Sequence, residues 1–205
     1  MNDPTVFVLD DDELVRRALE RLFRSVGIEC RTFADPEAFL ALERPDGPTC
    51  LVLDVRMSGM SGLEVQQALA SRGLDMPVIF MTGHATVPLS VRAMKHGAQD
   101  FLETPVDEQA MLDAVNLAIQ RDREHLRKES RIDALRQSEG SLTPRERQEF
   151  ELVVRGTLNN QIAHELGTTE KTVKVHRAAV MRKMEAGSLA ELVRMAERLE
   201  VAGDG

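Results

Sequence analysis

The sequence has few aromatic residues and only two cysteines. Among its 205 residues there is no tryptophan or tyrosine and there are seven phenylalanines, so its hydrophobic cores must be largely aliphatic. Cys30 and Cys50 match neither the spacing of a metal site nor a disulfide framework, and we interpret both as reduced thiols in a core. No apolar run approaches the roughly 20 residues that a membrane-spanning helix needs, and the chain begins without the pattern of a secretory signal. We therefore predict a cytoplasmic protein with no membrane partner.

The net charge of −8 conceals two parts of different character. Residues 1–124 hold 12 basic and 21 acidic residues, whereas residues 125–205 hold 14 basic and 13 acidic ones. Five of the basic residues fall within residues 170–184, beside a single acid, Glu170. A local basic patch attracts nucleic acid even when the total charge is negative. The length also suits two domains of ordinary size.

The first part alternates short apolar runs with amphipathic helical patterns. Strands are predicted at Thr5–Leu9, Ile28–Phe33, Thr49–Leu53, Pro77–Met81 and Asp100–Leu102. The first, third and fourth are apolar nearly throughout, which is typical of parallel strands covered by helices on both faces. Strand–helix units with right-handed crossovers predict an α/β fold, a doubly wound five-stranded parallel sheet, over residues 1–124. Residues 125–140 are highly charged and are predicted to form a helical linker.

Acidic residues stand where two of these strands end. Asp10 and Asp11 follow the first strand and Asp54 follows the third, while Thr82 places a hydroxyl after the fourth. Because parallel strands present their carboxyl ends at one edge, we expect these side chains to converge. Neighbouring carboxylates repel each other and favour a hard divalent cation such as Mg²⁺, and a carboxylate can also become an aspartyl phosphate. An ordinary helix N-cap would explain Asp12 by itself, but not the whole set.

The stretches VFVLDDD, LVLDVRM, VIFMTGH and AQDFLETP, at this spacing, resemble the receiver domain of bacterial two-component response regulators over about residues 4–124. The resemblance implies a flavodoxin-like fold and a sensor histidine kinase as partner, which transfers a phosphoryl group to Asp54. It also implies that Asp10, Asp11 and Asp54 bind Mg²⁺ together with the backbone carbonyl of Arg56.

The same resemblance implies a switch and exposes two departures from the family pattern. Thr82 would be the hydroxyl that moves to the phosphoryl group, and Phe101 the aromatic side chain that reorients with it. Thr104 stands where the family has a lysine, before Pro105, so the site has one positive charge fewer. We therefore expect weaker or slower phosphorylation, an altered lifetime of the phosphoryl group, or poor transmission to Thr82. Ser58 stands where the family usually has proline.

Residues 141–205 are helical throughout by pattern. Pro144 suits the first turn of one helix, Asn159 is expected to cap a second, and Gly167 to end it. A third, basic helix and a fourth with an apolar stripe follow. Two short helices joined at a glycine turn, the second one basic, predict a helix-turn-helix within a small all-α four-helix domain.

The stretches LTPRERQ, LNNQIAHELG and KTVKVHRAAVMRKM closely resemble the DNA-binding domain of the LuxR/FixJ/NarL type. The resemblance implies base-edge contacts from Lys174, Val175 and Ala178, and phosphate or edge contacts from Lys171, Thr172 and Arg177. Asn160 stands where the family commonly has a lysine, so we expect a weaker phosphate contact there. The partner would be double-stranded DNA, bound by a homodimer.

Together these features predict a transcriptional response regulator, not an enzyme, which is phosphorylated on Asp54 by a sensor histidine kinase and dimerises on promoter DNA. One alternative is an atypical regulator that signals without stable phosphorylation, because Thr104 replaces the lysine. A remote alternative is a Mg²⁺-dependent aspartyl phosphatase. Such enzymes would place the nucleophile in a D-x-D pair after the first strand, whereas Asp10 and Asp11 are adjacent.

Overall fold

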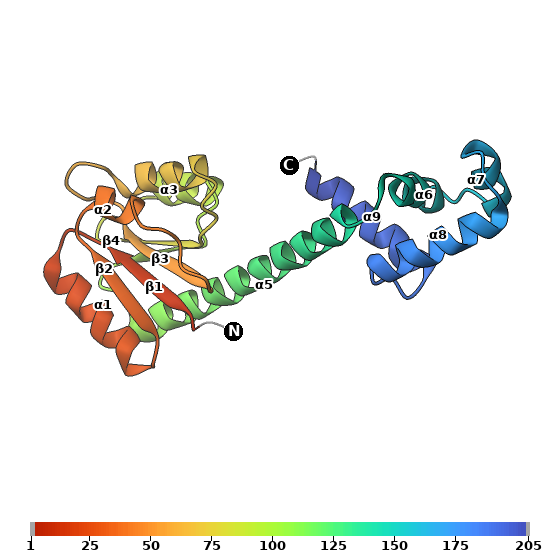
Figure 1. Ribbon diagram of the computed structural model, residues 1–205. Helices are drawn as coiled ribbons and strands as arrows, with labels where there is room; N and C mark the ends of the chain where they lie inside the picture. Colours follow the sequence, from red (N-terminus) through yellow and green to blue (C-terminus); the bar gives the residue numbers. More distant parts are fainter. Residues whose placement is uncertain (1–2, 204–205) are drawn as a thin grey trace. The chain divides into compact units, whose positions relative to one another are not determined.

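The computed structural model describes residues 3–203, and the chain forms two compact units, one up to Leu126 and one from Arg127 (Figure 1). Helix α5 (Glu108–Gly140) contributes residues to both units. Residues 1–2 and 204–205, the ends of the two predicted domains, lie outside the described residues. No helix within residues 3–203 combines the length and the apolar character needed to span a membrane.

The first unit is an α/β fold around a five-stranded parallel sheet, as predicted. Its strands are β1 (Thr5–Leu9), β2 (Glu29–Phe33), β3 (Thr49–Asp54), β4 (Val78–Thr82) and β5 (Asp100–Glu103). They lie in the order β2-β1-β3-β4-β5, and all neighbouring pairs are parallel. Strands β3 and β4 end one residue later than predicted, so Asp54 and Thr82 are the last residues of their strands rather than the first residues beyond them.

Helices cover both faces of this sheet. Alternate residues of β1 face opposite sides: Val6 and Val8 pack with α1 (Glu13–Ser25) and α5, and Phe7 and Leu9 pack on the other side. That other side is covered by α2 (Pro36–Leu40), α3 (Gly62–Ser71) and α4 (Val87–Lys95). Figure 1 shows α1 and α3 on opposite sides of the sheet. Burial on both faces explains why the central strands are apolar nearly throughout.

The second unit is all-α. It comprises the end of α5 and the helices α6 (Pro144–Val154), α7 (Asn159–Glu165), α8 (Glu170–Lys183) and α9 (Leu189–Gly203). Its core joins Phe150, Ile162, Val180 and Leu192, one residue from each of α6 to α9. The prediction for α7 was wrong in one respect: its N-cap is Leu158, and Asn159 is the first helical residue. The Asn159 side chain instead accepts a hydrogen bond from Arg177 at 3.1 Å.

Candidate functional site

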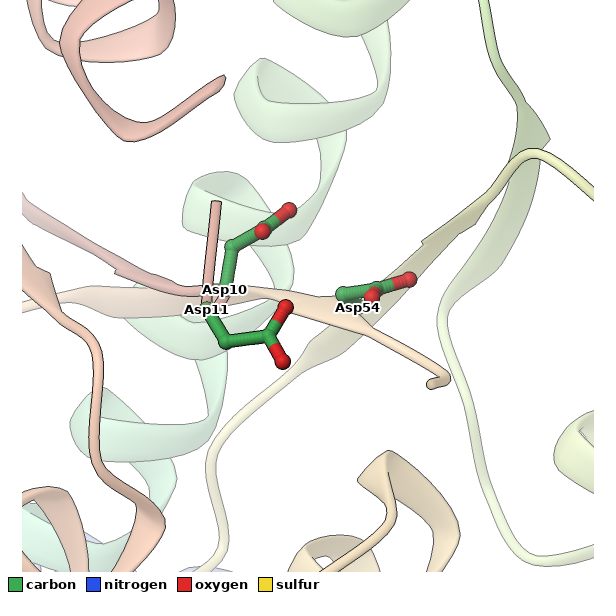
Figure 2. Close-up of side chains that lie close together, drawn as sticks. All are labelled: Asp10, Asp11 and Asp54. Carbon is green, nitrogen blue, oxygen red and sulfur yellow. The ribbon is translucent and has the colours of Figure 1, made fainter. Parts of the chain in front are cut away.

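Three aspartates meet at the carboxyl ends of β1 and β3. Asp10 and Asp11 follow β1, and Asp54 ends β3, its neighbour in the sheet. Each contributes a carboxylate oxygen, and these oxygens lie within 4.8 Å of one another. Figure 2 shows the three side chains gathered at the strand ends. The sequence-based expectation that these acids converge therefore agrees with the structure.

Burial disfavours the ionised form of the Asp10 carboxyl group. The residue is 4% exposed, and this desolvation raises the pKa of its carboxyl group to about 6, with further contributions from the charges of Asp54 and Asp11. A hydrogen bond from the backbone N–H of Asp12 at 2.7 Å opposes the shift but does not cancel it. A cation at this point would relieve both the repulsion and the lost hydration.

The backbone of Asp54 packs closely against Gly62, the first residue of α3. Burial raises the pKa of its carboxyl group, while hydrogen bonds from the backbone N–H groups of Arg56 and Val55 lower it. Behind it, Gly62 donates its N–H to the carbonyl oxygen of Val55 at 3.0 Å. A Cβ on Gly62 would lie 2.3 Å from the carbonyl oxygen of Asp54, so this close approach requires glycine.

Asp11 has a partner that the sequence did not reveal. Both the backbone N–H and the hydroxyl of Ser58 donate to its Oδ2, at 2.9 and 2.8 Å. These bonds hold the pKa of Asp11 below its usual range, so this carboxylate is kept ionised. Proline at position 58 has neither donor. The sequence did show serine where the family usually has proline, but whether Ser58 reaches Asp11 depends on the conformation of the loop.

The three residues predicted as a switch lie at the end of β4, within β5 and just after β5. Thr82 is 2% exposed and pairs in register with Glu103, the last residue of β5, so Thr104 is the first residue beyond that strand. Thr104 donates its N–H to the carbonyl oxygen of Thr82 at 2.9 Å, and its peptide bond to Pro105 is cis. Phe101 is half-buried, with its ring centroid 6.2 Å from that of Phe80 in the core. Their roles in switching stay predictions.

The exposed face of α8 carries the residues predicted to read DNA. Lys174, Val175 and Ala178 are exposed, together with Lys171 one turn earlier. Val175 is 62% exposed. The opposite face, with Val173 and Val180, is buried in the core. The helix therefore presents one basic and one core face, as the sequence pattern predicted.

The remaining predicted DNA contacts are partly engaged within the protein. Thr172 makes a hydroxyl–hydroxyl hydrogen bond of 3.0 Å with Thr169, the N-cap of α8. Arg177 is half-buried beside Asn159 of α7. Asn160 is exposed, and its side-chain oxygen accepts the N–H of Gln161 at 2.9 Å. These bonds fix the side chains without blocking the exposed face of α8.

Comparison with known families accounts for both units. The family model of the response regulator receiver domain matches residues 6–116, more than half of the chain, and that of luxR-family bacterial regulatory proteins matches residues 140–196. The chain belongs to the response regulator family. It is a DNA-binding transcriptional response regulator of the FixJ/LuxR type.

Several relatives resemble this response regulator over nearly its whole length. Nodulation protein W of Bradyrhizobium diazoefficiens is 46% identical over 97% of the chain and 88% of that protein. Transcriptional regulatory protein FixJ of Azorhizobium caulinodans is 47% identical over 93% of the chain and 90% of its own length. The solved structure of response regulator StyR has a TM-score of 0.87 at 47% identity, covering 96% of this chain and all of that one. The alternative of an aspartyl phosphatase finds no support in these relatives.

The donor set of the response regulator fits Mg²⁺. Asp10, Asp11 and Asp54 offer only hard oxygen ligands, and Mg²⁺ is typically bound by one or two carboxylates together with water and phosphate oxygens. Arg56 was predicted to contribute its carbonyl oxygen. Its backbone N–H and its guanidinium charge both lower the pKa of Asp54. A ligand role for the carbonyl stays a prediction.

We expect Mg²⁺ affinity to fall about tenfold for each pH unit below 6, because the cation must displace the proton that Asp10 retains up to that pH. Above pH 6 the affinity levels off. In the metal-free protein the folded state binds this proton more tightly than the unfolded state. Asp10 therefore contributes less to stability as pH rises from about 4 to 6. Calorimetric titration with MgCl₂ at several pH values tests this, and Asp10→Asn serves as the control that loses the binding. An affinity unchanged between pH 5 and 7 would contradict it.

Proposed function

We propose that this response regulator is a phosphorylation-dependent transcription factor. A sensor histidine kinase donates a phosphoryl group to Asp54, with Mg²⁺ bound by Asp10, Asp11 and Asp54. The protein then dimerises and binds promoter DNA through α8. The observation that carries the proposal is the convergence of the three carboxylates at the ends of β1 and β3 in a chain of this family.

The site supports the transfer in chemical terms. A carboxylate oxygen of Asp54 attacks the phosphorus atom while the bond from phosphorus to the donor's imidazole nitrogen breaks, and the imidazole leaves. Mg²⁺, when bound, supplies positive charge to the phosphoryl oxygens. The backbone N–H groups of Arg56 and Val55 favour the ionised form of the Asp54 carboxylate, and the Ser58 N–H holds Asp11. Thr82 supplies a buried hydroxyl at the end of the adjacent strand.

Replacement of Asp54 by asparagine is expected to abolish the response to phosphorylation. With Mg²⁺ and a small phosphodonor or fluoroberyllate, the natural protein should dimerise and retard a DNA duplex selected from a random library, whereas Asp54→Asn should remain at its basal level. Asp113→Asn, which removes an exposed acid on α5, is the matched control and should respond normally. Light scattering and gel retardation measure the two outcomes. Equal DNA binding in all conditions would refute phosphorylation dependence.

Introducing a lysine at position 104 is expected to speed phosphorylation. Thr104→Lys adds a positive charge just after β5, at the edge of the sheet where Asp54 lies, and one charge in a partly buried site is worth about tenfold or more in rate. Thr104→Met, with a similar stem and no charge, is the control. The rate of phosphoryl uptake from a small donor and the lifetime of the aspartyl phosphate are measured by phosphate-affinity electrophoresis. If both variants match the natural protein, the missing charge does not limit the response.

A further inference from the structure

The second unit contains a buried acid beneath the DNA-binding helix. Glu149 of α6 is fully buried, with 0% exposure. Its Oε1 lies 2.7 Å from Nδ1 of His176 on α8, and its Oε2 is buried and finds no hydrogen-bond partner among residues 3–203. A buried carboxylate that is ionised needs a counter-charge, because its hydration is lost.

The neighbouring charged side chains are engaged elsewhere. The other ion pair between α6 and α8 joins Glu146 to Lys183 at 2.6 Å, and Arg177 donates to Asn159 of α7. Within the described part of the chain, His176 is therefore the one side chain hydrogen-bonded to Glu149 that can carry a positive charge. The charge of Glu149 is balanced when the imidazole of His176 carries two protons.

His176 lies on a flank of the DNA-binding face. It follows Val175 by one residue, which places it about 100° around the helix axis from that exposed side chain. One third of the His176 side chain, 33%, is exposed. Arg177 lies a further 100° around the helix from His176, with the buried Val173 and Val180 between them, so the two border the buried face on either side and each adjoins one edge of the exposed face. A helix inserted into the major groove runs between phosphate backbones, so residues on both flanks can reach phosphates.

We propose that Glu149 is a positioning residue for DNA binding: it holds His176 as an imidazolium whose Nε2–H donates to a DNA phosphate. Nδ1 is directed to Glu149, and no group among residues 3–203 pairs with Nε2. Only the imidazolium donates from both nitrogens, because neutral imidazole has one donor and one acceptor. With the carboxylate on one side and the phosphate on the other, both hydrogen bonds are charge-assisted.

The salt dependence of DNA binding tests this chain of contacts. Each phosphate contact by a cation adds about 0.9 to the slope of log affinity against log salt concentration. Glu149→Gln keeps an acceptor for the Nδ1–H group of His176 but removes the negative charge that stabilises the imidazolium. His176→Asn keeps a donor toward Glu149 but has no equivalent of Nε2 to bind the phosphate. Both variants, and the double variant, are expected to lower the slope by the same amount, about 0.9. The measurement uses the full chain and one duplex selected from a random library.

Two outcomes would overturn the proposal. If Glu149→Gln changes the melting temperature but leaves the salt slope as in the natural protein, the pair only stabilises the fold. If the effects of the two single variants on the slope add in the double variant, Glu149 does not act through His176. The ring ¹⁵N chemical shifts of His176 in the natural protein bound to DNA supply a readout that needs no variant. Two protonated nitrogens are expected, and a neutral ring would refute the proposal.

Discussion

Replacing Asp122 by alanine is expected to lower the free energy of unfolding of the first unit by about 3–5 kcal/mol, the usual cost of removing one partner of a buried ion pair. The Asp122 side chain is 1% exposed and accepts two hydrogen bonds from Arg44, both at 2.7 Å. It also accepts the N–H of Thr49 at 2.6 Å and the hydroxyl of Thr49 at 3.2 Å. One carboxylate on α5 thus fastens the segment after α2 and the first residue of β3.

Alanine at this position leaves a buried N–H and a largely buried guanidinium without their acceptor. Thr49 is 0% exposed and the Arg44 side chain only 17% exposed, so water cannot replace the lost bonds fully. A domain is typically stable by about 5–15 kcal/mol, so this loss removes a large fraction of the total.

Circular dichroism during urea unfolding measures the effect, since the chain has no tryptophan or tyrosine for fluorescence. Asp113→Ala, which removes an exposed acid from the same helix, should change stability by no more than about 0.5 kcal/mol. The pair Arg44→Met with Asp122→Leu should recover part of the loss, because it leaves no buried charge. A loss below about 1 kcal/mol for Asp122→Ala would show that the ion pair does not fasten these segments.

Replacing Lys174 by alanine is expected to weaken binding to a selected DNA duplex about tenfold to a hundredfold, the effect of one good contact to a base edge. Lys174 is exposed on α8 beside Val175 and Ala178. Among the described residues it forms no ion pair that would have to break before it contacts DNA. The helix itself should persist, because Val173 and Val180 anchor its other face.

The comparison of two DNAs separates a base contact from a phosphate contact. Loss of a base contact weakens binding to the selected duplex more than binding to a duplex of scrambled sequence, whereas loss of a phosphate contact weakens both equally. Fluorescence anisotropy with both duplexes measures this, and Lys128→Ala removes an exposed lysine outside α8 as the control. Equal weakening on both DNAs would reassign Lys174 to the phosphate backbone.

The fold was predictable wherever a periodic pattern is set by burial. The central strands are buried on both faces, so their apolar runs predicted a parallel sheet, and Asp54 and Thr82 were placed within one residue of the observed strand ends. The beginning of α6 was equally predictable from Pro144, and the structure adds a capping box between Thr143 and Glu146, which depends on only four consecutive residues. The cap of α7 was predicted incorrectly, since the Asn159 side chain is taken by Arg177, 18 residues away.

Polar pairs that join distant parts of the chain escaped prediction. Ser58 and Asp11 are 47 residues apart, and Arg44 and Asp122 are 78 residues apart. For Glu149 a signal existed: it stands one residue before Phe150 and four before Val153, on the inward face of α6, where a charged residue must find a partner. The pattern could not name His176 as that partner, because the crossing of α6 and α8 depends on packing.

The aspartate cluster and the second unit illustrate the same division. Short-range order along the chain was enough to establish which residue types end the strands and which helix is basic, because helix and strand periodicity and capping act over a few residues. Other features exist only in the folded chain. The carboxylates of Asp10, Asp11 and Asp54 lie within 4.8 Å of one another, and Asp10 is buried. Asp11 is hydrogen-bonded to Ser58, and Glu149 contacts His176. Those features depend on contacts between residues far apart in the sequence and on the loss of solvent around them, and both arise only when the elements pack.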